Sequence, residues 1–367
     1  MNTMDARKTL NKQRIVEFAK AQGLDLVGVA DIGRFDGAPP RMHPAAILPE
    51  AKSVIVVARR IIRGNWRGIE EGTYWPNYTY FGYHGLLNSF FIPVGVYETA
   101  CLIEDAGFEA VPYYPGVPEG QAPAAPVRPD TVGANVHLAI RIAGVAAGLG
   151  EIGWSKVFLT REFGPRVRLA AIITDMELEP DPLVEPGSLC DRCMACVPSC
   201  LSAAIPHKRE GRTVEIRIDD KVYDWGDVDM GRCTLGYHGG DPQVSPFLHK
   251  TLPGYEIDVT KQNVTEDAAY KLCWPMAHGT WRPTEEDPSG LLVEGHNQLI
   301  RWGGGPGAAS YGVEGSRGCM RSCFDHLEHK GTIPAFEGGR FIKRKRWSLP
   351  MRCGAQQTDE SDAKAKD

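Results

Sequence analysis

The sequence lacks the features of a membrane or exported protein. Its 367 residues contain no run of about 18 apolar side chains, which a membrane-spanning helix requires. The N-terminal segment, from Met1 to Ala30, contains neither an uninterrupted apolar stretch with a small-residue cleavage site nor a twin-arginine pair. We therefore expect a soluble, cytoplasmic protein with no membrane partner.

Basic residues are not in excess, and cysteines are few for this length. With 41 Lys and Arg against 46 Asp and Glu, the net charge is −5, which argues against general nucleic-acid binding. Ten cysteines are too few for a disulfide scaffold in so long a chain. All of them except Cys101 follow residue 189, and this clustering suggests metal binding.

The region 1–180 predicts a mixed α/β domain. A helix is expected over residues 5–22 and another that ends near Gly107; strands are expected at 24–30, 53–59, just after Gly107, and at 167–174. The apolar residues of 135–147 fit both the two-residue period of a strand and the 3.6-residue period of a helix, so this segment is undecided. The Pro/Gly/Ala segment 115–130 is expected to be a long loop that could serve as a lid. A second domain is expected over 181–339. Residues 340–367 form a basic run, "RFIKRKRW", and a charged tail expected to be disordered.

Residues 190–200, "CDRCMACVPSC", place four cysteines at spacings typical of a two-cluster ferredoxin. Such a run gives three ligands to one [4Fe–4S] cluster and its fourth to another, whereas zinc sites usually use separated CxxC pairs. "GSRGCMRSC" matches the end of a second run, with Ser316 in its first position. The predicted ligands cross over: Cys190, Cys193, Cys196 and Cys323 for cluster 1, and Cys200, Cys233, Cys319 and Cys273 for cluster 2.

Several of these cysteines have alternative interpretations. Ser316, or a cluster with three cysteines, could replace Cys273 in cluster 2. Cys233 and Cys273 could also be buried apolar thiols. Cys101 is expected in the core, and Cys353 has no assigned role.

The segment "GLGEIG" matches the GxGxxG pattern of dinucleotide sites through Gly148, Gly150 and Gly153, and Asp175 follows near the end of a strand. A nicotinamide-dependent dehydrogenase is therefore one alternative. Against it, the preceding residues are not clearly a strand, and the following "WSKVFLTREFGP" is short for a crossover helix.

Taken together, "AAGLGEIG", "LTREFGPRVRLAAIITDMELEPD" and "CDRCMACVPSC" resemble the core of the corrinoid-dependent reductive dehalogenases and of their relatives, the epoxyqueuosine reductases. "GRCTLGY" and "RGCMRSC" look like the later cluster ligands of that superfamily. The match is specific over about residues 134–205. It departs from the family at Ser316, where cysteine is usual, and at Leu201, where proline is usual.

The resemblance implies an α/β fold in which a corrinoid-binding core is followed by a ferredoxin-like, two-cluster iron–sulfur domain. It implies base-off cobalamin, reduced to Co(I) by the two [4Fe–4S] clusters, for reductive cleavage of a small organohalide. The electron donor would be a low-potential ferredoxin or flavodoxin. No DxHxxG segment offers a histidine to cobalt. The implied corrinoid contacts are Gly148, Gly150, Gly153, Thr160, Phe163, Gly164 and Arg166.

Reductive dehalogenation also requires a proton donor. The candidates are Tyr113, Tyr114, His137 and Lys156, and Tyr80, Tyr83 and His84 of "YWPNYTYFGYHG" could line an aromatic substrate site.

Two further classes remain open at this stage. An epoxyqueuosine reductase would act on transfer RNA, whose phosphates "RFIKRKRW" could contact. The aspartate that those enzymes place before the glycine motif is absent, however, because "GANVH" carries Asn135 and His137 there. A simple ferredoxin-like electron carrier is disfavoured, since it would not need the α/β domain expected over region 1–180.

Overall fold

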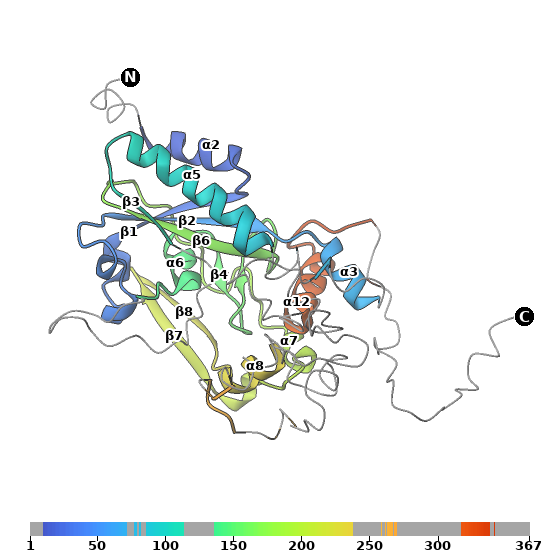
Figure 1. The fold of residues 1–367 in the computed structure, drawn as a ribbon. Helices are drawn as coiled ribbons and strands as arrows, with labels where there is room; N and C mark the ends of the chain where they lie inside the picture. The colour runs from blue at the N-terminus through green and yellow to red at the C-terminus, as the bar shows by residue number, and fades with distance from the viewer. Residues whose placement is uncertain are drawn as a thin grey trace, which may run out of the picture.

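A four-stranded antiparallel sheet forms the centre of the fold (Figure 1). The computed structural model describes residues 10–71, 77–78, 81, 86–113, 136–237, 258, 261, 263–266, 268–269, 317–337 and 341. The strands are β1 (Leu26–Asp31), β2 (Ser53–Arg60), β3 (Ala110–Tyr113) and β6 (Val167–Thr174), in the order β1-β2-β6-β3. Every neighbouring pair is antiparallel. The late strand β6 therefore separates β2 from β3, as in a split βαβ unit.

The sheet is covered on both faces, which explains why its central strands read as continuous apolar runs. In β2, Ile55 and Val57 pack on one face, whereas Val54 and Val56 pack on the other. All four are fully buried. The sheet thus divides two hydrophobic clusters, one on each face.

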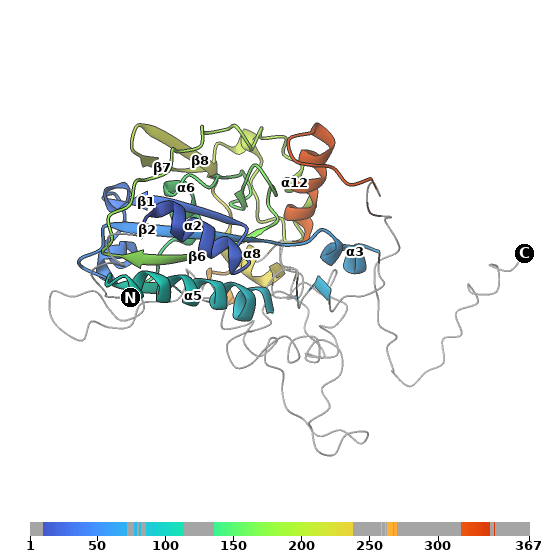
Figure 2. The same ribbon diagram turned by 90° about the horizontal axis from the view of Figure 1, so that it is seen from above.

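Helices α2 (Lys12–Ala21) and α5 (Ile92–Asp105) cover one face, and α6 (Ile140–Ala146) lies on the other (Figures 1 and 2). Helix α2 is capped by the preceding residue, Asn11, whose side-chain oxygen accepts the Arg14 N–H, and its apolar stripe buries Ile15 and Ala19. The short helix α3 (Gly64–Glu70) follows β2, and a π-helical turn, Leu87–Phe91, leads into α5.

The mixed helix and strand content expected of region 1–180 is confirmed. The predicted strands and the helix that ends near Gly107 are present with small differences at their ends. The helix expected over residues 5–22 spans Lys12–Ala21, and residues 5–9 lie outside the described residues. The undecided segment 135–147 contains helix α6. The predicted lid, 115–130, lies outside the described residues.

Beyond β6 the described chain forms short elements around the cysteines. These are α7 (Cys196–Ser199), the hairpin β7 (Thr213–Ile218) and β8 (Lys221–Gly226), α8 (Met230–Tyr237) and α12 (Arg317–Lys330). A smaller pair, β4 (Glu151–Ile152) and β5 (Phe158–Leu159), precedes β6.

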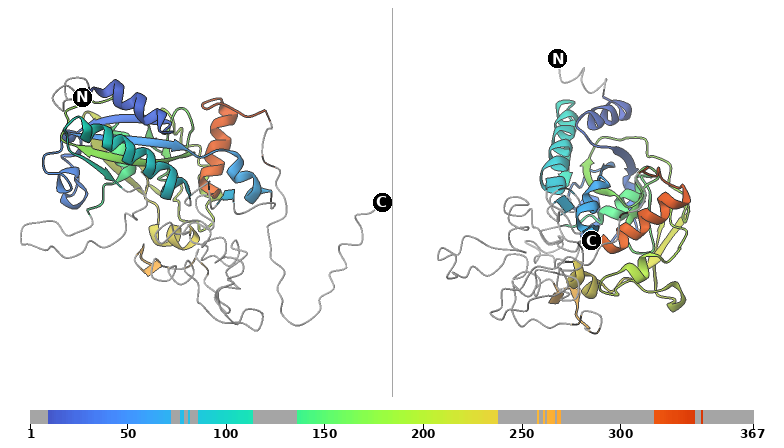
Figure 3. Two further views of the ribbon diagram at one scale, coloured as in Figure 1. Left: turned by 45° about the horizontal axis from the view of Figure 1, so that its top comes forward. Right: turned by 90° about the vertical axis from the view of Figure 1, so that its right-hand side faces the viewer.

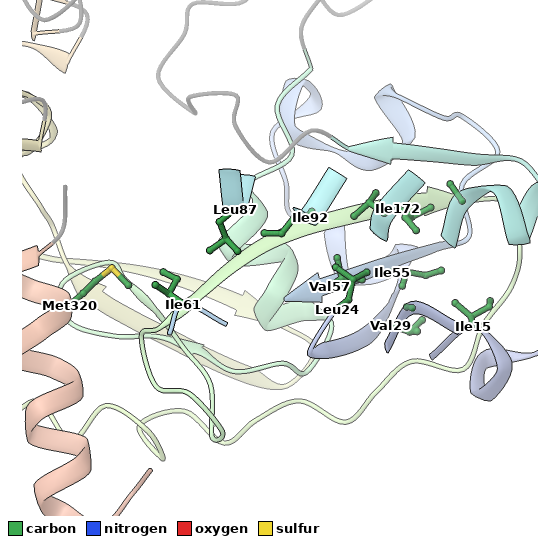
Figure 4. Packing of buried hydrophobic residues seen from close by; sticks show 14 of the residues in the cluster. Ile15, Leu24, Val29, Ile55, Val57, Ile61, Leu87, Ile92, Ile172 and Met320 are labelled. Atoms are coloured by element: carbon green, nitrogen blue, oxygen red, sulfur yellow. The ribbon is translucent and has the colours of Figure 1, made fainter. Parts of the chain in front are cut away.

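Helix α12 lies beside α3 at one end of the sheet (Figures 2 and 3). Three of its residues, Met320, Phe324 and Leu327, belong to the hydrophobic cluster that lies between the sheet and helices α2 and α5. Figure 4 shows Met320 near Ile61 at the end of that cluster. Residues before and after position 180 therefore share a core here; the domain boundary at 180 stays a prediction.

Among the described residues, no helix combines the length and the apolarity needed to span a bilayer.

Candidate iron–sulfur site

The loop that carries the first three cysteines has an unusual backbone conformation. Arg192 and Met194 both adopt left-handed backbone conformations, with φ of 55° and 63°. Such conformations are rare outside glycine and are retained where the surrounding structure requires them. Cys196 then begins α7. The loop leaves Cys193 exposed and Cys196 buried.

Helix α12 brings Cys323 to this loop from the far end of the chain. Its first turn lies so close to α7 that a Cβ on Gly318 would be 2.0 Å from the Ser199 carbonyl oxygen. Burial raises the pKa of Cys323 well above its usual value, and the charges of Cys190, Cys196 and Cys193 raise it further. Cys190 and Cys323 also pack against the same small group of buried residues, so the loop that carries three of the cysteines predicted for cluster 1 lies beside the fourth.

Cys196 shows the same effect, since burial and then its neighbours Cys190 and Cys193 raise its pKa to about 12. Thiolates crowded in this way repel one another, and a bound metal cluster relieves that repulsion because it supplies positive charge. The donor set fits an iron–sulfur cluster.

The cysteines predicted for cluster 2 lie next to this group. Burial and then the charge of Cys200 raise the pKa of Cys233, on α8, to about 12. Cys200, Cys233 and Cys319 all pack against one hydrophobic cluster, which contains Trp154 and Cys196. Cys273 and its alternative Ser316 lie outside the described residues, so the fourth ligand stays a prediction.

Ion pairs fix α12 against the rest of the fold. Arg63, just before α3, forms a buried pair with Glu328, with its Nε 3.2 Å from the carboxylate. At the opposite side of the helix, Asp191 accepts a hydrogen bond from the Lys330 ammonium and forms another with the His326 imidazole, each at 2.9 Å. Although partial burial acts in the opposite direction, these hydrogen bonds lower the pKa of Asp191 to about 2. The cysteine loop and the helix are thereby tied together directly.

The glycine motif has a structural role that sequence reasoning did not anticipate. It follows helix α6 and contains strand β4, so it does not connect a strand to a helix as a dinucleotide-binding turn does. A Cβ on Gly150 would lie 1.8 Å from the Leu159 carbonyl oxygen, which shows that the glycine allows β4 to approach β5. This arrangement argues against the nicotinamide alternative.

The same segment contacts Cys190 twice. The buried carboxylate of Glu151 accepts the Cys190 N–H at 2.5 Å, and the backbone N–H of Trp154 donates to the Cys190 sulfur at 3.3 Å. Sequence analysis missed both residues. The available signal was the acidic Glu151 in an otherwise apolar, glycine-rich segment.

The other predicted corrinoid contacts are engaged within the protein. Thr160 and Gly164 exchange backbone hydrogen bonds, and the Thr160 hydroxyl accepts the Phe163 N–H at 3.1 Å. The buried Arg166 donates to the Ile61 carbonyl oxygen at 2.9 Å. Burial lowers the pKa of Arg166, while Glu328 raises it. Their contact with a corrinoid stays a prediction.

The candidate proton donors lie on separate elements. Tyr113 ends β3 and is half-buried against the α6 side of the sheet, and the buried His137 donates its backbone N–H to the Arg41 carbonyl oxygen at 3.1 Å. Lys156 donates to the Met230 sulfur at 3.6 Å, and its charge acts on Cys233. Tyr114, Tyr80, Tyr83 and His84 lie outside the described residues.

A small cavity adjoins Cys190, lined among others by Glu151, Trp154, Arg192 and Tyr223. Its volume is about 10 Å³, enough for roughly one water molecule and far too small for a macrocycle. A corrinoid site therefore requires more of the chain than these residues.

No family model matches the sequence. The chain is 37% identical over 185 residues to the tetrachloroethene reductive dehalogenase of Dehalobacter restrictus, which covers 46% of this chain and 32% of that protein. The corresponding enzyme of Sulfurospirillum multivorans is 38% identical over 98 residues, or 25% of this chain and 19% of that one. Epoxyqueuosine reductase of Bacillus subtilis is 24% identical over 225 residues, or 53% of this chain and 51% of that one.

Solved structures give weaker similarities. An epoxyqueuosine reductase from Streptococcus thermophilus matches 87% of this chain and 81% of its own, with 16% identity and a TM-score of 0.41. A catabolic reductive dehalogenase matches 71% of this chain and 33% of its own, with 16% identity and a TM-score of 0.42.

The sequence relatives confirm the resemblance inferred from the motifs. They are reductive dehalogenases and an epoxyqueuosine reductase, which are oxidoreductases. The chain spans about a third of the length of the dehalogenases that it matches.

Proposed function

We propose that this protein is an iron–sulfur- and corrinoid-dependent reductase that cleaves a carbon–halogen bond in a small organohalide. The observation that carries the proposal is the convergence of the loop carrying Cys190, Cys193 and Cys196 with α12, which carries Cys323. Four thiolates from a tight loop and a distant helix are the donor set of a [4Fe–4S] cluster in a two-cluster arrangement.

The exposure of the thiols supports a path for electrons. Cys193, predicted for cluster 1, is exposed, whereas Cys233, predicted for cluster 2, is half-buried. A low-potential ferredoxin or flavodoxin would deliver electrons at the exposed side, one at a time, and the inner cluster would pass them inward. Iron–sulfur clusters reach potentials as low as about −700 mV, which this chemistry requires.

The corrinoid rests on the relatives and the motifs. When bound, it would supply a strongly reducing metal centre for carbon–halogen cleavage. The protein would position the substrate, exclude water and donate a proton to carbon, for which Tyr113, Tyr114, His137 and Lys156 remain the candidates.

The test begins with anaerobic reconstitution using iron, sulfide and cobalamin. We expect about eight irons per chain and the absorption spectrum of base-off cobalamin. The C323A variant should lose about four irons. Cys101→Ala is the matched control, because Cys101 lies on α5, outside both predicted cysteine groups, and this variant should keep full iron content. Full iron in C323A, or zinc bound in preference to iron, would refute the cluster assignment.

Activity with a chemical reductant separates the candidate substrates. Halide release from chlorinated or brominated aromatic and alkene substrates would support the proposal. An epoxyqueuosine-type activity is the second candidate, favoured by the Bacillus subtilis relative, which covers more of this chain than the dehalogenases do. Reduction of an epoxyqueuosine-containing transfer RNA stem loop without halide release would establish that candidate instead.

A further inference from the structure

Glu151 stands out among the buried charges because it makes no ion pair of its own in the described structure and is directed at the cysteine loop. Its side chain is 3% exposed. One carboxylate oxygen accepts the N–H groups of Leu189 and Cys190 at 2.6 and 2.5 Å, and the other accepts the N–H of Gly187 at 2.5 Å. A carboxylate that accepts three backbone N–H groups is a strong anchor, since hydrogen bonds to an ionised acceptor are about twice as strong as neutral ones.

The anchored segment leads directly into the first cysteine. Three backbone donors from residues 187–190 are directed toward Glu151. The Cys190 sulfur instead receives the Trp154 N–H, from the residue three positions after Glu151. The segment from Glu151 to Trp154 therefore contacts both the backbone and the sulfur of Cys190, and the Arg192 N–H is a second backbone donor to that sulfur.

The carboxylate also places a negative charge beside the site. One Glu151 carboxylate oxygen lies 2.5 Å from the backbone nitrogen of Cys190, so its charge is held next to the residue predicted to ligate the cluster. A fixed negative charge close to an iron–sulfur cluster disfavours the uptake of an electron, and so lowers its reduction potential.

We infer that Glu151 is a positioning residue of the first iron–sulfur site: it holds residues 187–190 in the conformation that presents Cys190, and its charge lowers the reduction potential of the cluster bound there. This inference rests on the proposed cluster assignment. It gives the acidic residue of the glycine motif a role toward the cluster rather than toward a nucleotide.

The first measurement does not require a cluster. Hydrogen exchange of the Leu189 and Cys190 amides is compared in metal-free wild-type protein and in E151Q. Gln keeps the size of the side chain but loses its charge, and its NH₂ group cannot accept a hydrogen bond. We expect these amides to exchange roughly tenfold to a hundredfold faster in E151Q, as the loss of hydrogen bonds to a charged acceptor implies.

Glu185→Gln is the matched control, because Glu185 lies near the same loop but is largely exposed and pairs with Lys221. It should leave both amides unchanged. Equal exchange in wild-type protein and E151Q, or equal acceleration in both variants, would overturn the anchoring role.

The second measurement is the midpoint potential of each cluster in the reconstituted protein, followed by electron paramagnetic resonance. The first cluster of E151Q should titrate at a higher potential than in wild-type protein, while the second cluster should change less. E151D, which keeps the charge, should retain a potential near that of wild-type protein. An unchanged first potential in fully loaded E151Q would overturn the electrostatic role.

If E151Q does not retain its first cluster, the iron content of E151D tests whether the anchor must be charged. Loss of four irons in E151Q but not in E151D supports the requirement for a charged anchor, and equal loss in E185Q contradicts it. If wild-type protein binds no iron, the proposed function fails, while the exchange experiment still tests the anchor by itself.

Discussion

Phe324→Ala tests whether the docking of α12 assembles the first cysteine site. Phe324 is fully buried one residue after Cys323. Its ring packs edge-on against Trp66 at a centroid distance of 5.3 Å and against Phe341 at 6.1 Å. It thus joins the helix that carries two cysteines to residues that follow the central strand β2.

The cost of this truncation follows from its burial. Replacing a buried Phe with Ala typically costs about 3–5 kcal/mol, because transfer free energy is lost and a cavity remains. Each edge-on ring pair contributes about 0.5–1.5 kcal/mol beyond its burial. Since 1.4 kcal/mol is a factor of ten in an equilibrium constant, docking of α12 should weaken by roughly a hundredfold or more.

The assay combines iron content with regional hydrogen exchange. In F324A, amides of α12 should exchange faster than in wild-type protein, with less acceleration in β6, and iron should fall by up to about four atoms per chain. Phe336→Ala is the control, because Phe336 is 48% exposed although it also contacts Arg63. Wild-type iron content together with less than about 1 kcal/mol of destabilisation in F324A would refute the argument.

Three further perturbations test separate features. Burial, and then the charges of Glu185 and Glu151, raise the pKa of Tyr223 to about 12. The folded state therefore favours the protonated phenol, and its contribution to the free energy of unfolding is present below pH 10 and is lost as pH rises toward 12. Denaturant unfolding should show a decline of at most about 3 kcal/mol over that range, absent in Y223F; parallel curves would contradict this. Lys156→Asn, which tolerates the left-handed backbone at φ 63°, should lower the potential of the second cluster in a redox titration, and an unchanged value would refute the charge effect. G150A should unfold at a far lower denaturant concentration than wild-type protein, because the added Cβ would meet a backbone oxygen. G64A is the control and should lose no stability, because an added Cβ there would have no atom within 4 Å. Similar unfolding midpoints for the two variants would contradict the packing argument.

The sequence was informative where structure is local. β2 and β6 could be predicted because continuous apolar runs bounded by polar residues indicate strands that are buried on both faces. The order β1-β2-β6-β3 could not, because pairing between β2 and β6 joins residues more than a hundred positions apart. Helix α6 stayed undecided because its apolar residues satisfy both periods.

The candidate site, too, could be predicted only in those features that neighbouring residues encode. The spacing within 190–200 indicated iron–sulfur ligands, and the second half-motif pointed to Cys323. Glu151 escaped because its partners lie 36 to 39 residues further along the chain. The glycine spacing suggested a nucleotide loop, although these glycines serve close backbone packing; identical spacing can arise from either requirement, and only the flanking elements distinguish them.

The charges around the two cysteine groups favour one direction of electron transfer. Beside cluster 1, Glu151 adds negative charge. Beside cluster 2, the positive charges of Arg141 and Lys156 act on Cys233 and outweigh the smaller opposing effect of Glu266. If the predicted clusters are bound, an electron would thus be more stable at the second site than at the first. We therefore expect the first cluster of the loaded wild-type protein to have the lower midpoint potential, so that electrons entering at Cys193 move inward. The reverse order of potentials, measured by redox titration, would be incompatible with entry at this surface.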